Sequence, residues 1–305
     1  MEATPILSII TPAFNGENFI CDCIDSVATQ NCAGVEHIIV DGGSADRTAQ
    51  ILRKEAETHS HLRWISEPDG GQSDALNKGI AMAKAEYIGI LNVDDFYEPG
   101  ALCRVVQIIK GLSSSRFIVG GCHVLTTGDE ILYIIQPTVL KFENIMVDDE
   151  KWPYPYNPSA YFYPKAIHDI IGPYNIEEHQ GMDLEFILAA IQVIEPLYID
   201  KVLGNWRYIP GTKTFNSLAD GSLWRIKRRI HRAAWRRSKP SIVVAPAPRS
   251  ARHTGNSAND VRRAVVVQAY RRALHLALLP RMAPLLRIRQ SKHDSCSGLR
   301  LRLIL

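Results

Sequence analysis

The sequence predicts an α/β protein whose amino-terminal part contains a parallel sheet, and three observations lead to this prediction. Short β-branched apolar runs alternate with stretches of helical periodicity over residues 7–93. Strands separated by helices of this length form right-handed βαβ units. Loops rich in Gly, Asp and Asn follow four of the apolar runs, as expected where parallel strands end at one edge of a sheet. A chain of 305 residues, 46% of them hydrophobic, is long enough to bury a sizeable core.

The expected elements follow in chain order from the periodicity of apolar residues. In the first part, strands are predicted at 7–14, 35–43, 62–69 and 86–93, and helices around 24–30, at 45–59 and at 73–85. Beyond residue 100 the pattern is less regular, with strands at 117–125 and 130–137, a Pro- and Tyr-rich loop at 152–164, and helices around 165–172 and 182–194. This second part is therefore expected to extend the sheet in a mixed arrangement.

The charge distribution predicts two parts of different function. Residues 220–305 hold 20 Lys and Arg against 3 acidic residues, whereas the preceding residues hold 15 against 29. We therefore expect a domain at 1–215, divided into halves at 1–100 and 101–215. A basic, partly helical and partly disordered extension should occupy 220–305 and face an anionic partner.

Cysteine spacing and hydropathy favour a cytoplasmic location. The six cysteines include no CxxC pair and no metal-ligand spacing with histidine, which favours reduced thiols. The start of the chain does not resemble a secretory signal, and no apolar stretch reaches the length of about 18 residues that a membrane-spanning helix needs. Peripheral attachment to the inner face of the membrane stays open as an addition to this expectation.

Two adjacent carboxylates, Asp94 and Asp95, end the apolar run at 87–91. Such a pair is costly near a core unless a positive partner lies beside it. A divalent cation that carries a diphosphate needs only one or two protein carboxylates, because phosphate oxygens and water complete its shell. A turn or helix-capping role explains the pair equally well on its own. Three further polar loops at the same edge favour the metal.

The other loops offer candidate nucleotide ligands, each with an alternative. Asp41 follows a strand and precedes two glycines, so it is placed to accept a hydrogen bond from a base or ribose. Phe14 suits stacking on a base, although packing in the core is the commoner fate of a single Phe. Asp74 and Lys78 lie one helical turn apart, which an exposed ion pair would explain.

Four ordered motifs, "TPAFN", "VDGGSADRT", "EPDGGQSDALNKGIAMAKAEYIGILNVDD" and "MDLEF", resemble the inverting GT-A glycosyltransferases of family 2. The similarity is strongest to the branch that builds bacterial O-antigen and exopolysaccharide repeats, and it covers residues 5–210. It implies a nucleotide-sugar donor, a saccharide or lipid-linked saccharide acceptor, and Mg or Mn as cofactor. The half at 1–100 would bind the nucleotide-sugar, and the half at 101–215 would bind the acceptor.

The resemblance also implies roles for particular residues. Asp95 would bind the metal, and Asp94 would face the ribose or the donor sugar. The implied nucleotide-sugar site as a whole consists of Pro12, Phe14, Asn15, Asp41, Gln72, Asp74 and Asp94.

An inverting transfer also needs a carboxylate base on the acceptor side, close to the attacking hydroxyl. The family carries an acidic residue at a helix start, and "GMDLEF" provides Asp183 there, with Met182 before it where many relatives have an acidic or small residue. Glu185 points elsewhere on a helix and is expected to be structural. His179 and Gln180 are candidates for contact with the acceptor.

A basic amphipathic pattern occupies 223–237, where Leu223, Ile226 and Ile230 share one helical face and arginines fill much of the rest. Two interpretations have equal weight: a helix lying on an anionic membrane surface, and a helix packed on the catalytic domain with its charges in water. Nucleic-acid binding ranks below both, because no nucleic-acid module accompanies the arginines.

Two other functions are alternatives to glycosyl transfer. A nucleotidyltransferase would be expected to have a basic, glycine-rich phosphate loop near the amino terminus, and "TPAFNGENF" lacks Lys and Arg. A non-catalytic nucleotide-sugar-binding or scaffold protein is the other alternative. The processive-synthase signature QxxRW is absent and is only echoed by "GNWRY" at 204–208, which favours single sugar additions.

Overall fold

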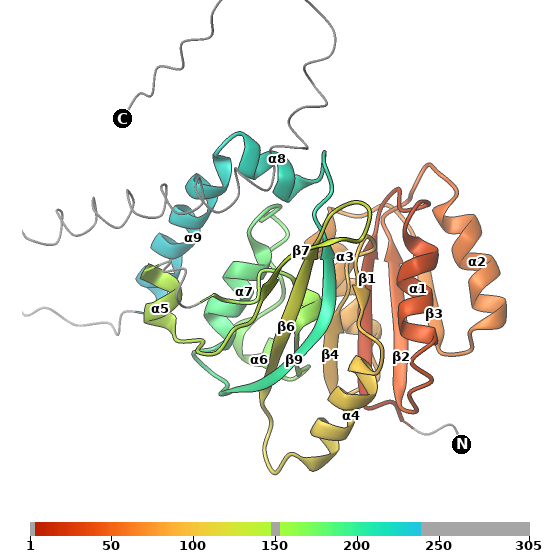
Figure 1. Cartoon of the computed structure of the whole chain (residues 1–305), viewed down its shortest axis with the longest axis horizontal. Coiled ribbons are helices and arrows are strands. Elements are labelled where there is room, and N and C mark those ends of the chain that lie inside the picture. Colours follow the sequence, from red (N-terminus) through yellow and green to blue (C-terminus); the bar gives the residue numbers. More distant parts are fainter. Residues whose placement is uncertain (1–3, 148–152, 239–305) are drawn as a thin grey trace, which may run out of the picture. The chain divides into compact units, whose positions relative to one another are not determined.

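The computed structural model describes residues 4–147 and 153–238 (Figure 1). Contacts within the chain divide it into a unit of Met1–Pro246 and a unit of Ala247–Leu305, and the described residues all belong to the first unit. The parts of the predicted basic extension beyond residue 238, including the segments predicted to be disordered, lie outside the described residues.

One mixed sheet of nine strands organises the described residues, in the order β3-β2-β1-β4-β8-β6-β9-β5, with β7 paired to β6. The four strands β3, β2, β1 and β4 run parallel, whereas β8 is antiparallel to both β4 and β6. The predicted α/β class, with a parallel first half and a mixed second half, is confirmed. The strand bounds are β1 Leu7–Ala13, β2 Val35–Asp41, β3 Leu62–Ser66, β4 Tyr87–Ile90, β5 Phe96–Tyr97, β6 Phe117–Leu125, β7 Ile131–Ile135, β8 Tyr161–Pro164 and β9 Pro196–Arg207.

Helices cover both faces of this sheet. Side chains of α3, α6, α7 and α9 share one core with the sheet, and side chains of α1, α2 and α4 fill two cores that include different sheet residues. Figure 1 shows α1 and α2 beside the strands of the parallel half, and α7 and α9 at the other half. The helix bounds are α1 Ile20–Ala28, α2 Thr48–Thr58, α3 Gln72–Met82, α4 Ala101–Gly111, α5 Phe142–Val147, α6 Ile167–Ile171, α7 Met182–Ala190, α8 Lys213–Ala219 and α9 Ser222–Ser238.

Strand β1 shows why the first strands were readable from the sequence. Ile10 points into the core of α3 and α7, and its neighbour Ile9 points into the core of α1 and α4. Both side chains are fully buried, because a parallel sheet is covered on both faces. A continuous apolar run is the signature that such a strand leaves in a sequence.

Strand β8 was predicted as part of a loop, and the structure corrects this. It lies between β4 and β6, in the middle of the sheet. Tyr161 and Tyr163 are fully buried on one face, and Phe162 is fully buried on the other. Prolines on either side hid the strand, because they are typical of loops.

Helix α9 settles part of the question raised by the basic stretch. Ile226 and Ile230 are buried in the same core as Leu184 and Ile187 of α7. Packing on the preceding domain is therefore confirmed for the apolar face of this helix, and that face does not lie on a membrane. No helix among the described residues is long and apolar enough to cross a bilayer.

Candidate active site

A cavity of about 630 Å³ opens where the parallel strands end, and all four predicted polar loops reach it. The loop after β1 contributes Pro12 and Phe14, and the loop after β2 contributes Gly42. Gln72 comes from the segment after β3, and the pair of Asp94 and Asp95 follows β4. The predicted convergence of these loops is confirmed. Second-half residues complete the lining: Tyr156, Asn157, Pro158, His179, Gln180, Met182, Asp183, Trp206, Gly211, Thr212, Lys213 and Thr214.

Phe14 lies at this cavity as an exposed aromatic ring. Its exposed fraction is 64%, so packing in the core, which its residue type favoured, is wrong. An exposed phenyl ring on a polar cavity wall is unfavourable in water and is typical of a stacking surface for a ligand ring.

Asp95 is fully buried and accepts three hydrogen bonds, two of them from distant parts of the chain. Asn157 Nδ2 and Asn92 Nδ2 donate to its Oδ2 atom over 2.7 and 2.9 Å, and the backbone N–H of Arg207 donates to Oδ1 over 3.1 Å. Burial, together with the charge of Asp94, raises the pKa of Asp95 well above its usual value despite these bonds. Burial also raises the pKa of Asp94, while Arg207 opposes the rise.

Arg207, a buried residue at the end of β9, is a cation next to the aspartate pair. Its Nε atom lies 2.7 Å from Asp129, and its Nη2 atom lies 3.1 Å from Asp22. The guanidinium group thus already has two carboxylate partners, and it reaches Asp94 only through the backbone carbonyl, over 3.4 Å. Among residues 4–147 and 153–238, no Lys, Arg or His side chain forms an ion pair with the carboxylate of Asp94 or Asp95.

This surplus of negative charge fits a divalent cation. Two hard carboxylates beside an open cavity are the donor set that Mg or Mn takes when a diphosphate supplies further oxygens. Within 4–147 and 153–238, no three His, Cys, Asp or Glu side chains converge as a closed metal site.

Asp183 lies across the same cavity, in the first turn of α7. Burial raises the pKa of its carboxyl to about 6, while the Tyr161 hydroxyl, which donates to Oδ1 over 3.3 Å, opposes this rise. Such a pKa suits a proton acceptor that works near neutral pH. Glu185 forms an ion pair with Arg237 of α9 over 2.9 Å, and it does not line the cavity.

Three residues of the implied nucleotide-sugar site lie outside the cavity lining. Asp41 is fully buried and accepts hydrogen bonds from Ser66 Oγ over 2.6 Å and from the hydroxyl of Ser44. Asp74 accepts from the backbone N–H of Gly70 and pairs with Lys78 over 3.3 Å, as the simpler interpretation of its spacing proposed. The third residue is Asn15.

Asn15 joins the first polar loop to the second. Its backbone N–H donates to Ser44 Oγ over 2.7 Å, and its Oδ1 accepts from the N–H of Ala45 over 3.0 Å. Its φ of 52° is in the left-handed region, which Asn tolerates better than most residues. Asn15 and Asp41 thus shape the loops behind the cavity wall.

Several cavity residues were not found from the sequence. Asn157 and Tyr156 belong to the Pro- and Tyr-rich loop, where no periodicity marks a functional residue. Trp206 belongs to "GNWRY", the segment noted only as an echo of a synthase signature. Lys213 follows Gly211, whose φ is +93°, and no pattern connects it with the acidic loops. Their only common property is position in space.

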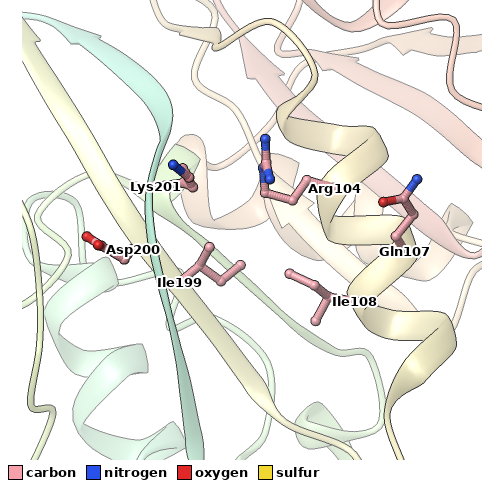
Figure 2. A pocket seen from close by; sticks show the side chains of 6 residues that line it. All are labelled: Arg104, Gln107, Ile108, Ile199, Asp200 and Lys201. Atoms are coloured by element: carbon pink, nitrogen blue, oxygen red, sulfur yellow. The ribbon is translucent and has the colours of Figure 1, made fainter.

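A second hollow of about 540 Å³ lies between α4 and the first half of β9 (Figure 2). Arg104 and Gln107 come from the helix, and Asp200 and Lys201 come from the strand. It contains none of the predicted site residues, whereas Trp206 of the first cavity lies at the other end of β9.

Comparison with known proteins matches residues 8–163 to the model of glycosyl transferase family 2. An uncharacterized glycosyltransferase of Mycobacterium tuberculosis is 32% identical over 206 residues, covering 67% of this chain and 75% of that protein. Two solved structures share the fold at 19% identity. One is S. aureus TarS 1-349 in complex with UDP-GlcNAc (TM-score 0.55; 68% of this chain and 60% of that chain). The other is mannosyltransferase PcManGT from Pyrobaculum calidifontis with GDP-Man and Mn2+ (TM-score 0.53; 78% and 66%).

Proposed function

Because this chain belongs to glycosyl transferase family 2, and is thus a glycosyltransferase with a GT-A fold, we propose that it transfers single sugars with inversion. The donor is a nucleotide-sugar, and the acceptor is a saccharide or a lipid-linked saccharide. One observation carries the proposal: a single cavity holds the charged pair of Asp94 and Asp95 together with Asp183. An acid pair for a diphosphate and a separate base are the two things that an inverting transfer requires.

The donor is assigned to the wall formed by the four loops that follow β1, β2, β3 and β4. Phe14 stacks on the base, Pro12 lies beneath it, and Gln72 and Asp94 face the ribose or the sugar. Gln72 is fixed for this role, because its Nε2 donates to Asn92 over 3.0 Å. Asn15, Asp41 and Asp74 lie outside the cavity lining and hold the loops of this wall in place. The nucleotide-sugars bound by TarS and PcManGT support this class of donor.

Asp95, with Asp94 beside it, would hold a Mg or Mn ion, and Mn2+ is present in the PcManGT structure. When bound, the ion offsets the charge that develops on the departing diphosphate. Lys213 would add to this effect, since it is the residue with a permanent positive charge among the described residues that line the cavity. An ammonium group next to a diphosphate stabilises the same negative charge.

Asp183 acts as the general base in this scheme. The acceptor oxygen forms its bond to the anomeric carbon while the bond from that carbon to the phosphate oxygen breaks. Asp183 takes the proton of the attacking hydroxyl, and the nucleoside diphosphate leaves with the bonding electrons. His179 and Gln180, which line the cavity just before α7, would contact the acceptor.

Replacing Tyr161 with phenylalanine should shift the acidic limb of the kcat/KM profile upward. In the wild type, kcat/KM should fall below pH 6, because protonated Asp183 cannot accept the proton. The Tyr161 hydroxyl stabilises the charged carboxylate, so its removal raises the pKa by about 0.5. Tyr163→Phe is the matched control, since the Tyr163 hydroxyl contacts His168 and Tyr174. Identical profiles for both variants would argue against Asp183 as the base.

The biological setting that we propose is surface polysaccharide biosynthesis on the cytoplasmic side of the membrane. The motifs that resemble the O-antigen and exopolysaccharide branch support it. Acceptors in such syntheses are saccharides built on lipid carriers, which would bring the enzyme to the membrane as a peripheral protein.

The proposal is tested with a panel of UDP-, GDP- and dTDP-sugars, with Mn or Mg, in the presence of saccharide acceptors. We expect one donor to release its nucleoside diphosphate in a metal- and acceptor-dependent manner. Release of pyrophosphate would identify a nucleotidyltransferase instead. Binding of nucleotide-sugars without turnover of any donor would identify a non-catalytic binding protein.

A further inference from the structure

The outward face of α9 carries a row of arginines. Arg225, Arg228, Arg232 and Arg236 follow one another at intervals of three or four residues, so they share one side of the helix. All four are exposed, and none forms an ion pair with a carboxylate of the described residues. We call these four residues the arginine face. Trp235, beside it, is 50% exposed.

The opposite side of α9 is fixed to the protein, which makes the arginine face a rigid surface. Ile226 and Ile230 pack so closely over the start of α7 that a Cβ atom on Gly181 would lie 2.1 Å from Ile230 Cδ1. Two ion pairs flank this contact, Arg229 with Glu178 at 2.5 Å and Arg237 with Glu185 at 2.9 Å. The helix thus divides its arginines between anchoring to α7 and facing outward.

We propose that the arginine face binds the surface of an anionic phospholipid bilayer. A straight row of guanidinium groups can contact many phosphates at once, and basic residues near an anionic membrane strengthen binding about fivefold each. Trp235 suits the boundary between water and lipid, where indole rings are enriched. The apolar face of the helix is not inserted, so attachment is electrostatic and weakens with salt.

Because α9 contacts residues next to the cavity, membrane binding by the arginine face would affect the active site. Only this functional consequence rests on the proposed function. Glu178, the partner of Arg229, directly precedes His179 and Gln180, which line the cavity. Binding of α9 to the bilayer would hold the acceptor side of the cavity close to the membrane. A lipid-linked acceptor would then be presented at the site from the lipid surface.

The test compares full-length variants in flotation with phosphatidylcholine vesicles, with and without phosphatidylglycerol. In the face variant, Arg225, Arg228, Arg232 and Arg236 are all changed to Gln. The control variant changes four exposed basic residues of α2 and α4 to Gln, an equal change in charge: Arg53, Lys54, Arg104 and Lys110. We expect wild type and control to bind anionic vesicles only, and the face variant to bind at least tenfold more weakly. Truncation after residue 219 is a poorer test, since it also removes Ile226 and Ile230 from the core.

Equal vesicle binding by the face variant and the control would overturn the inference. So would wild-type protein that binds single-stranded RNA but not anionic vesicles, which would make nucleic acid the partner. Turnover with a soluble saccharide acceptor should be the same in wild type and face variant. If wild type, face variant and control all lack turnover, and only the face variant loses vesicle binding, the proposed function is wrong. The inference that the arginine face binds membranes is then still supported.

Discussion

Asp95→Asn is expected to lower kcat/KM by about 10³-fold or more. The amide is neutral, so the charge that would hold Mg or Mn beside Asp94 is halved, and the departing diphosphate loses its main stabilisation. The variant should also lose the gain in UDP or GDP affinity that Mn gives to the wild type, as measured by titration calorimetry with and without Mn.

Asp95 also holds Asn92, Asn157 and Arg207 in place, so its structural role needs a separate readout. A purely structural role would weaken nucleotide binding equally with and without Mn. Asp22→Asn is the matched control, because Asp22 is 61% exposed and shares Arg207 with Asp129. We expect it to keep activity within a few-fold of wild type. A Mn-dependent gain in affinity that survives in Asp95→Asn would exclude Asp95 as the metal ligand.

Asp183→Asn should separate binding from transfer. The amide has nearly the shape of the carboxylate, and its oxygen can still accept the hydrogen bond from Tyr161. Donor affinity should therefore stay within about threefold of wild type, whereas transfer should fall by 10² to 10⁴-fold, roughly the usual contribution of a general base. Calorimetry with the donor and single-turnover transfer measure the two effects.

Glu185→Gln is the matched control for this substitution. Glu185 lies on the same helix two residues later, but it faces Arg237 of α9 and not the cavity. Its variant should transfer sugar at nearly the wild-type rate. If Asp183→Asn does the same, the base lies elsewhere on the cavity wall, and the proposed mechanism is wrong.

Local sequence was sufficient for the parallel half of the fold. The runs that form β1, β2 and β4 are mostly apolar because both of their faces are buried. Such strands can be recognised from a short run of consecutive residues. Helix α3 was equally visible, since its buried residues Ala75, Leu76 and Ile80 recur at helical spacing. In this half, residues close together in the sequence are enough to tell each helix from each strand.

In the second half of the sheet, strands β6 and β7 were predicted from the sequence, whereas β5, β8 and β9 were not. In β9, only Leu203 to Asn205 are fully buried in succession, because the strand also forms an exposed surface. Pairing of β9 with β6 joins residues about 80 positions apart, so tertiary contacts decided its conformation. Intrinsic preference for strands is weak compared with such contacts.

What the sequence determined on its own is the set of acidic and polar loops that follow strands, because topology brings the ends of parallel strands to one edge. From this follow the placements of Asp94, Asp95 and Gln72 at the cavity. Position in a loop does not fix which way a side chain points, and hydrogen bonds turned Asp41 inward, to Ser44 and Ser66.

The tertiary structure alone decided the partners of these groups. Asn157 and Arg207 reach Asp95 across 62 and 112 residues of chain, distances over which no sequence period operates. It also decided the direction of α9, whose pattern fits a membrane surface and a protein core equally well. The hydrophobic effect is non-directional, so it does not decide whether an apolar helix face packs on protein or on lipid. In the folded chain, Ile226 and Ile230 pack against Gly181, and the arginine face is exposed.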